Sequence, residues 1–166
     1  MHAYQQELQN CLPDLWRYAY ALCRNADTAD DLVQDCAERA LRKRRLWRPT
    51  GPLKPWLIKM IRNIYLNDLR ARRARPNTIT MDQMTNQPIA VDALSDRLAL
   101  SETARALSAL QEDQRDVLLL IVVGGLSYKD AAISLDIPLG TLMSRLGRAR
   151  SKLREVTSQD AKEGVQ

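Results

Sequence analysis

The segment LSYKDAAISLDIPLGTLMSRLGRAR, residues 126–150, decides the fold of this chain. Ser127, with Asp130 three positions later, predicts the capped start of a short helix. The residues Asp136 to Pro138 predict a turn, and a second helix is expected over about residues 139–154. Two short helices joined by a tight turn, the second of them basic, form the helix-turn-helix pattern, which places its second helix in the major groove of duplex DNA.

The second helix of this pattern is expected to be amphipathic. Its apolar side chains recur every three or four residues and must pack on the rest of the domain. They are Leu139, Leu142, Leu146, Ala149 and Leu153. Arginine can pair with the O6 and N7 acceptors of guanine, and serine and threonine hydroxyls can reach bases or phosphates. We therefore expect duplex-DNA contacts from the polar side chains of this helix: Thr141, Ser144, Arg145, Arg148 and Lys152.

Charge is concentrated in two basic blocks along the chain. Residues 39–75 carry thirteen basic side chains and one acidic side chain, a net charge of +12. Residues 141–154 carry five basic side chains and no acidic one, whereas residues 1–38 have a net charge of −5. Two separate basic blocks, in a chain whose overall charge is +5, indicate two contacts with a polyanion.

Three more helices are expected before residue 75. The first covers residues 13–24, with Pro13 in its first turn, and the second covers 28–45, capped by Asp27. Residues 46–55 hold three prolines and a glycine, which predicts a loop before the third helix at about 55–73. The apolar face of that third helix is expected at Leu57, Met60, Ile61 and Ile64, headed by Trp56 in the core.

The predicted fold class is all-α, with two small helical domains joined by a flexible linker. The linker is recognised by Pro76, Pro88 and the absence of hydrophobic periodicity between them. The second domain is expected to contain helices at about 96–110 and 112–123 before the helix-turn-helix segment. The expected boundaries are residues 1–75 for the first domain, 76–95 for the linker, 96–158 for the second domain and 159–166 for a disordered tail.

Several classes of function are disfavoured by the composition. The three cysteines form no CxxC pair and the only histidine is His2, so neither a metal site nor a histidine-based enzyme is expected. The sequence holds no glycine-rich phosphate loop, and we expect no cofactor. Cys11, Cys23 and Cys36 are expected as small buried thiols. No apolar run approaches the roughly 20 residues of a membrane span, and the N-terminus lacks the layout of a secretion signal.

The helix-turn-helix segment also resembles a known family. Residues 137–150, IPLGTLMSRLGRAR, resemble the region 4 signature of extracytoplasmic-function (ECF) sigma factors of the sigma-70 family, and Leu110 with residues 114–117 is similar to the helix before it. Asp136 departs from the family, which usually has glycine at this turn, but aspartate tolerates left-handed backbone better than most residues. The resemblance implies that the five polar residues above read the −35 promoter element.

The first domain resembles region 2 of the same family in two places. Residues 29–35, ADDLVQD, are similar to the segment that docks on the polymerase β′ subunit, with Asp35 where glutamate is usual; without the resemblance, these carboxylates would suit a helix N-terminus equally well. Residues 56–63 and 68–73 resemble the −10 recognition helix. The resemblance implies polymerase contacts at Asp30, Asp31, Gln34, Asp35 and Leu41, and −10 contacts at Lys59, Arg62, Asn63, Arg70, Arg72 and Arg73.

The partners implied by the resemblance are core RNA polymerase, through its β′ and β subunits, promoter DNA and an anti-sigma factor. It implies a location in the bacterial cytoplasm and no small-molecule substrate. Two alternatives stay open. The chain could be a stand-alone helix-turn-helix regulator, or a sigma mimic that binds only an anti-sigma factor. The arginines retained at both expected DNA surfaces argue against the mimic, which has no need of them.

Overall fold

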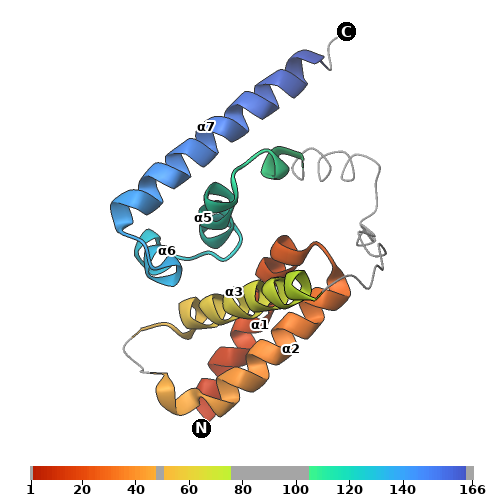
Figure 1. The fold of residues 1–166 in the computed structure, drawn as a ribbon. Helices are drawn as coiled ribbons and strands as arrows, with labels where there is room; N and C mark the ends of the chain where they lie inside the picture. Colours follow the sequence, from red (N-terminus) through yellow and green to blue (C-terminus); the bar gives the residue numbers. More distant parts are fainter. Residues whose placement is uncertain (1, 48–50, 76–104, 164–166) are drawn as a thin grey trace.

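The first domain is a three-helix unit. The structure, a computed structural model, describes residues 2–47, 51–75 and 105–163 (Figure 1). The first domain contains α1 (His2–Cys23), α2 (Ala26–Arg42) and α3 (Leu53–Ala74), with a short 3₁₀ turn, η1 (Arg44–Leu46), after α2. Each of the three helices packs against the other two. Their shared core includes the fully buried side chains of Leu15, Tyr18, Cys36, Leu57 and Ile61.

Helix α1 is longer than the sequence predicted. Pro13 lies inside the helix instead of in its first turn, and its side chain is exposed. Proline in a helix interior removes one backbone hydrogen bond. Leu8 and Cys11, which precede Pro13, are buried in the same core as Leu15. The packing of this apolar face therefore outweighs the local cost of the proline, because most helical stability in proteins comes from tertiary packing.

The start of α2 also differs from the prediction. Its cap is Asn25, whose side-chain oxygen accepts a hydrogen bond from the Thr28 amide at 2.9 Å. Asp27, the predicted cap, lies in the first turn instead. Asparagine and aspartate are almost equally good caps, and the chain reversal at Arg24, with φ of 57°, sets the earlier start.

Two core predictions for α3, at Met60 and Trp56, need correction, and one buried residue was missed. Ile58, which was not expected on the apolar face, is fully buried, whereas Met60 is only partly buried. Trp56 is also only partly buried and packs on the edge of the core. The helix begins at Leu53, so the predicted loop is shorter than expected at its C-terminal end.

The second domain contains α5 (Glu112–Val122), α6 (Tyr128–Leu135) and α7 (Leu139–Glu163), preceded by a helical turn at residues 105–108. The predicted helix at 112–123 and the predicted short helix after Ser127 are confirmed. Helix α7 runs well beyond the expected end at residue 154, into the segment that was predicted to be a disordered tail. The expected linker at 76–95 and the first part of the helix predicted at 96–110 lie outside the described residues.

The two domains pack against each other. Helix α6 lies against α3 and α5 contacts α1, while α7 packs on α5 and α6 (Figure 1). The buried apolar side chains of both domains form one contiguous cluster. The described segments are helical throughout their regular structure, which agrees with the predicted fold class. None of their helices combines the length and apolarity that a bilayer span requires.

Candidate nucleic-acid interface

The helix-turn-helix geometry is formed by α6, its turn and α7. The Ser127 hydroxyl accepts a hydrogen bond from the Asp130 amide at 3.0 Å and donates one to the Asp130 carboxylate at 2.7 Å, so the predicted cap is confirmed. Asp136 adopts the left-handed conformation with φ of 52°, and its amide donates to the carbonyls of Ala132 and Ile133. The predicted turn therefore persists without the family's usual glycine, because aspartate tolerates this backbone region.

Helix α7 buries one face and exposes the other. Leu142, Leu146 and Ala149 are buried as predicted. Leu139, at the start of the helix, is 47% exposed and does not belong to the core, contrary to the prediction, and Leu153 is only partly buried. The buried stripe fixes the rotation of the helix, so its polar residues face outward.

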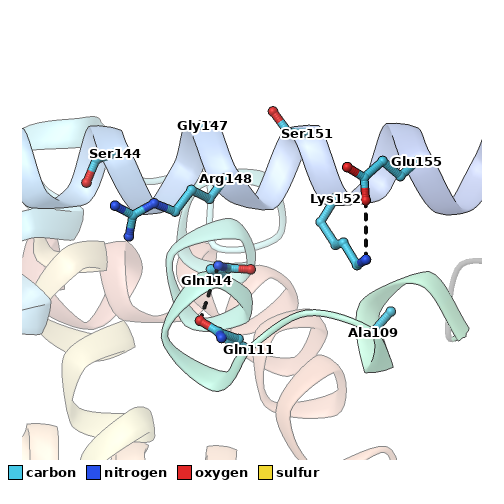
Figure 2. Close-up of a pocket in the computed structure, with 9 residues that line it drawn as sticks. All are labelled: Ala109, Gln111, Gln114, Ser144, Gly147, Arg148, Ser151, Lys152 and Glu155. Carbon is cyan, nitrogen blue, oxygen red and sulfur yellow. Dashed lines mark hydrogen bonds and ion pairs between the residues drawn. The ribbon is translucent and has the colours of Figure 1, made fainter.

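A groove of about 610 Å³ lies between α7 and the start of α5 (Figure 2). Three of the five predicted duplex-binding residues line it: Ser144, Arg148 and Lys152. Gly147 and Ser151 lie beside them, and a β-carbon added at Gly147 would meet nothing within 4 Å. The groove offers the hydroxyl of Ser144 and the guanidinium of Arg148, donors that bases and phosphates of duplex DNA accept. The Lys152 ammonium is paired at 3.2 Å with Glu155, which also lines the groove, through an exposed contact that water and salt weaken.

The opposite wall of the groove was missed by the sequence reasoning. Gln111 and Gln114 line it from the N-terminal end of α5, together with Ala109. Arg115 holds this wall in place, because its guanidinium donates to the carbonyls of Leu107 and Leu110, both at 3.0 Å. The only local signal was a pair of glutamines at a helix start, which also suits a solvated surface.

The other two predicted duplex-binding residues lie away from the open groove. Arg145 forms an ion pair with Asp113 of α5, with 3.2 Å between its Nε and the carboxylate oxygen, and its side chain is 29% exposed. Thr141 is half-buried, and its carbonyl accepts a hydrogen bond from the Ser144 hydroxyl. The five residues therefore do not form one continuous contact surface.

The six predicted −10 residues lie on α3, where four are exposed to solvent and two face the second domain. Asn63, Arg70 and Arg73 are exposed, as is Arg72, which also lines a small pocket beside Tyr65. Lys59 and Arg62 instead face the second domain. Arg62 forms an ion pair with Asp116 of α5 at 2.6 Å. The ammonium group of Lys59 lies 3.7 Å from Asp136 and donates a hydrogen bond to the Ile133 carbonyl at 3.4 Å.

The predicted polymerase-docking residues share the outer surface of α2. All five are exposed: Asp30, Asp31, Gln34, Asp35 and Leu41. The indole N–H of Trp16 donates to Asp30 at 2.7 Å and so fixes the first carboxylate. Asp35 pairs with Arg39 one turn later at 3.2 Å. The surface is acidic, ordered and accessible to a basic partner.

Two family models match the chain in the order of its two domains. Residues 8–75 match sigma-70 region 2, and residues 100–153 match sigma-70 region 4. The ECF RNA polymerase sigma factor EcfG of Rhodopseudomonas palustris is 35% identical over 162 residues, covering 96% of this chain and 87% of that protein. The chain belongs to the ECF family of RNA polymerase sigma factors. ECF sigma factor SigC of Mycobacterium tuberculosis is 33% identical over 141 residues, covering 84% of this sigma factor and 75% of that one.

Two solved structures agree with the fold of this sigma factor. RpoE from Bartonella quintana, in complex with the anti-sigma factor NepR, matches with a TM-score of 0.75 and 31% identity, covering 95% of this sigma factor and 98% of that chain. CnrH, in complex with the cytosolic domain of CnrY, matches with a TM-score of 0.70 and 26% identity, covering 96% and 90%. Both matches extend over the two domains and not over one alone.

Membership of this family settles the class of activity. Sigma factors are non-enzymatic transcription initiation factors that bind core RNA polymerase and promoter DNA. The thiols of this sigma factor are free. Cys11 and Cys36 are buried as predicted, whereas Cys23 is only half-buried. Burial raises the pKa of the Cys36 thiol to about 12, so this group is an uncharged part of the core at neutral pH.

Proposed function

We propose that this sigma factor docks on core RNA polymerase through α2 and directs it to promoters by reading a −35 element with α7 and a −10 element with α3. The groove between α7 and α5 carries the proposal. It places Arg148, Ser144 and Lys152 together on the exposed side of a capped helix-turn-helix. Since core polymerase is the partner, the protein acts in the bacterial cytoplasm.

The −35 element is the contact that the accessible groove supports best. Arg148 supplies a bidentate donor for a guanine, while Lys152 supplies a point charge for a phosphate. The two glutamines on the facing wall add donors and acceptors within the same groove. Thr141 and Arg145 belong to the edge of this surface, where Arg145 supports the helix through Asp113.

The −10 element is assigned to α3 and the segment before it. Single strands are held by cationic grooves and by stacking on aromatic side chains. Arg70, Arg72 and Arg73 give the exposed C-terminal half of α3 its positive charge. Lys59, Arg62 and Asn63 extend this surface toward the second domain. Trp47, whose ring is tilted against that of Tyr4 with 5.4 Å between ring centroids, is an aromatic side chain at the start of the predicted loop.

Run-off transcription with purified core polymerase tests this function. The sigma factor and core enzyme are combined on a library of templates, and promoter-dependent products are expected only when both are present. If no template in the library gives such a product, the proposed function is wrong. If instead the pure protein binds one duplex tightly without core enzyme, the stand-alone regulator becomes the better description.

An anti-sigma factor is the proposed regulator. Both well-matched solved structures are complexes of two proteins, and one of them is the sigma factor RpoE bound to the anti-sigma factor NepR. Several large apolar side chains are exposed on the second domain, among them Val122, Ile133 and Met143, which suits a protein partner. Co-purification from the native host tests this. Recovery of only free or polymerase-bound protein under every stress condition would count against an anti-sigma factor.

A further inference from the structure

One side of α3 is held against the second domain. Lys54, Ile58 and Arg62 follow one another at intervals of four residues and therefore lie on one side of the helix. The Lys54 ammonium approaches Gly125 so closely that a β-carbon at this glycine would lie 3.1 Å from it. Arg62 pairs with Asp116. Ile58, between the two, is fully buried although it lies off the apolar face predicted for the isolated domain.

Two ion pairs cross from the proposed −10 residues to the second domain. The Arg62–Asp116 pair is the shorter at 2.6 Å, and its two side chains are only 19% and 20% exposed. The Lys59–Asp136 pair is 3.7 Å long, and the aspartate is 87% exposed. Water and salt weaken an exposed pair far more than a half-buried one. Arg62–Asp116 is therefore the main electrostatic contact of the interface.

The first turns of α5 bind arginines from both proposed DNA surfaces. Asp113 pairs with Arg145 of α7, and Asp116, less than one helical turn later, pairs with Arg62 of α3. Glu112 lies in the same pocket with these four side chains. Carboxylates in this position offer the arginines the same chemistry as DNA phosphates, namely charged oxygen acceptors.

We propose that the acidic start of α5, formed by Glu112, Asp113 and Asp116, mimics DNA within the chain and closes the second domain over the −10 surface in the free sigma factor. This inference rests on the proposed function. In the closed form, Arg62 and Lys59 are occupied by Asp116 and Asp136, while the groove of α7 stays open. Separation of the domains releases the two cations for the −10 strand. Asp136, at the turn of the helix-turn-helix, gives this chain a second interdomain contact through Lys59.

The interface is suited to opening. Taking a charged pair out of water costs free energy that its mutual attraction only partly returns, so a half-buried ion pair fixes an arrangement without making it very stable. A competing polyanion can therefore separate the domains. Coupling between two sites through such a two-state element typically changes affinity by about 5-fold to 150-fold.

The first test compares two neutral variants of the full-length chain. Asp116→Asn removes the interdomain pair, whereas Glu112→Gln removes the same charge from the same helix without removing a pair that the structure contains. Small-angle X-ray scattering at low salt measures the radius of gyration of each. We expect Asp116→Asn to be more expanded than the wild type and Glu112→Gln to be as compact as the wild type. The double variant Arg62→Asp with Asp116→Arg exchanges the two charges and so restores an ion pair at the same place. It should be as compact as the wild type.

The second test measures access to the −10 surface. A mixed-sequence single-stranded oligonucleotide, labelled for fluorescence anisotropy, is titrated with each single variant. Asp116→Asn should bind about fivefold to tenfold more tightly than Glu112→Gln, which is the low end of such couplings. The two variants have equal net charge, so the general increase in affinity for a polyanion that follows from losing one negative charge is the same in both and drops out of their comparison. Asp136→Asn, at an exposed position that cannot disturb folding, should give a smaller change in the same direction.

Three results would overturn the proposal. The wild type could already be extended at low salt, Asp116→Asn could match Glu112→Gln in both measurements, or the charge exchange could fail to restore compaction. Failure of run-off transcription is distinguishable from these, because it would remove the promoter function and leave the scattering and oligonucleotide results unchanged. Circular dichroism confirms that each variant is folded before the comparison is made.

Discussion

Helices α3 and α7 look alike in sequence but differ in their surroundings. Both are long and amphipathic, with 22 and 25 residues, and both carry a basic face assigned to promoter DNA. The basic face of α7 opens onto a groove. Two of the cations on α3 are paired with carboxylates of the other domain. The difference teaches that ion pairs within one domain, such as Lys152–Glu155 and Arg145–Asp113, leave a basic helix face open, whereas ion pairs between domains cover it.

The largest expected effect comes from weakening the packing of α7 on its domain. Leu142 is fully buried beneath the helix-turn-helix, so Leu142→Ala should lower the free energy of unfolding by about 2–5 kcal/mol through lost burial and the cavity left behind. Urea denaturation followed by circular dichroism measures this. Leu57→Ala, at a fully buried position of α3, is the matched change in the other domain. A loss of less than about 1 kcal/mol at Leu142 would mean that α7 is not anchored as described.

The next effect separates two arginines of α7. Arg148→Ala should weaken binding to the −35 duplex by about 1–3 kcal/mol, because this side chain lies in the groove and can reach a base. Arg145→Ala should weaken binding less, because Arg145 is paired with Asp113. Titration of the full-length variants with promoter duplex identified by run-off transcription measures both. The reverse order would show that the Arg145–Asp113 pair opens on binding DNA.

A third change tests the division of labour between the domains. Asp35→Arg reverses a charge on the proposed docking surface of α2 and should weaken core-polymerase binding about tenfold, or about 1.4 kcal/mol. Its exposed pair with Arg39 contributes little to stability, so the variant should fold normally. Glu38→Arg makes the same charge change about one turn later, at an exposed residue that accepts a hydrogen bond from Gln34 of the docking surface, and should weaken core-polymerase binding less than Asp35→Arg. Binding to the −35 duplex should be unchanged in both variants. If Asp35→Arg weakened duplex binding as much as core-polymerase binding, the assignment of α2 to polymerase docking would be contradicted.

The smallest effect concerns an ion pair inside the first domain. Asp14 of α1 binds Lys54 of α3, and this hydrogen bond holds the pKa of the Asp14 carboxyl below its usual value. A lowered folded-state pKa stabilises the fold above the unfolded pKa, and the stabilisation is lost as the pH falls through the folded value. Asp14→Asn should therefore cost less than about 1 kcal/mol at pH 7, with the difference from wild type disappearing in acid. Thermal unfolding at pH 7 and pH 3 checks the sign, and an equal difference at both pH values would exclude this explanation.

The helix-turn-helix could be predicted from the sequence because its signals are local. The Ser127 cap and the Asp136 turn each depend on residues within three or four positions, and both are confirmed. The extent of α1 was predicted wrongly for the opposite reason. Whether the chain continues as a helix through Pro13 depends on the packing of Leu8 and Cys11 against distant helices, which no local pattern reports.

The candidate site was predictable in its residue types but not in its pairings. Sequence reasoning assigned Arg62 and Lys59 to one DNA surface and Arg145 to the other. Their carboxylate partners could not be identified, because Asp116 lies 54 residues from Arg62 in the chain. The full burial of Ile58 was also missed, because the width of a buried helix face depends on neighbouring helices that are distant in the sequence.

The continuity of the buried cluster across both domains has a consequence for local opening and hydrogen exchange in this protein. Two domains with separate cores can unfold one after the other, but side chains packed in one cluster lose their contacts together. In the closed form, backbone amides in the middle of α3 and α5 should therefore exchange their hydrogens with solvent at similar, slow rates. Opening the interface should accelerate exchange on both helices at once.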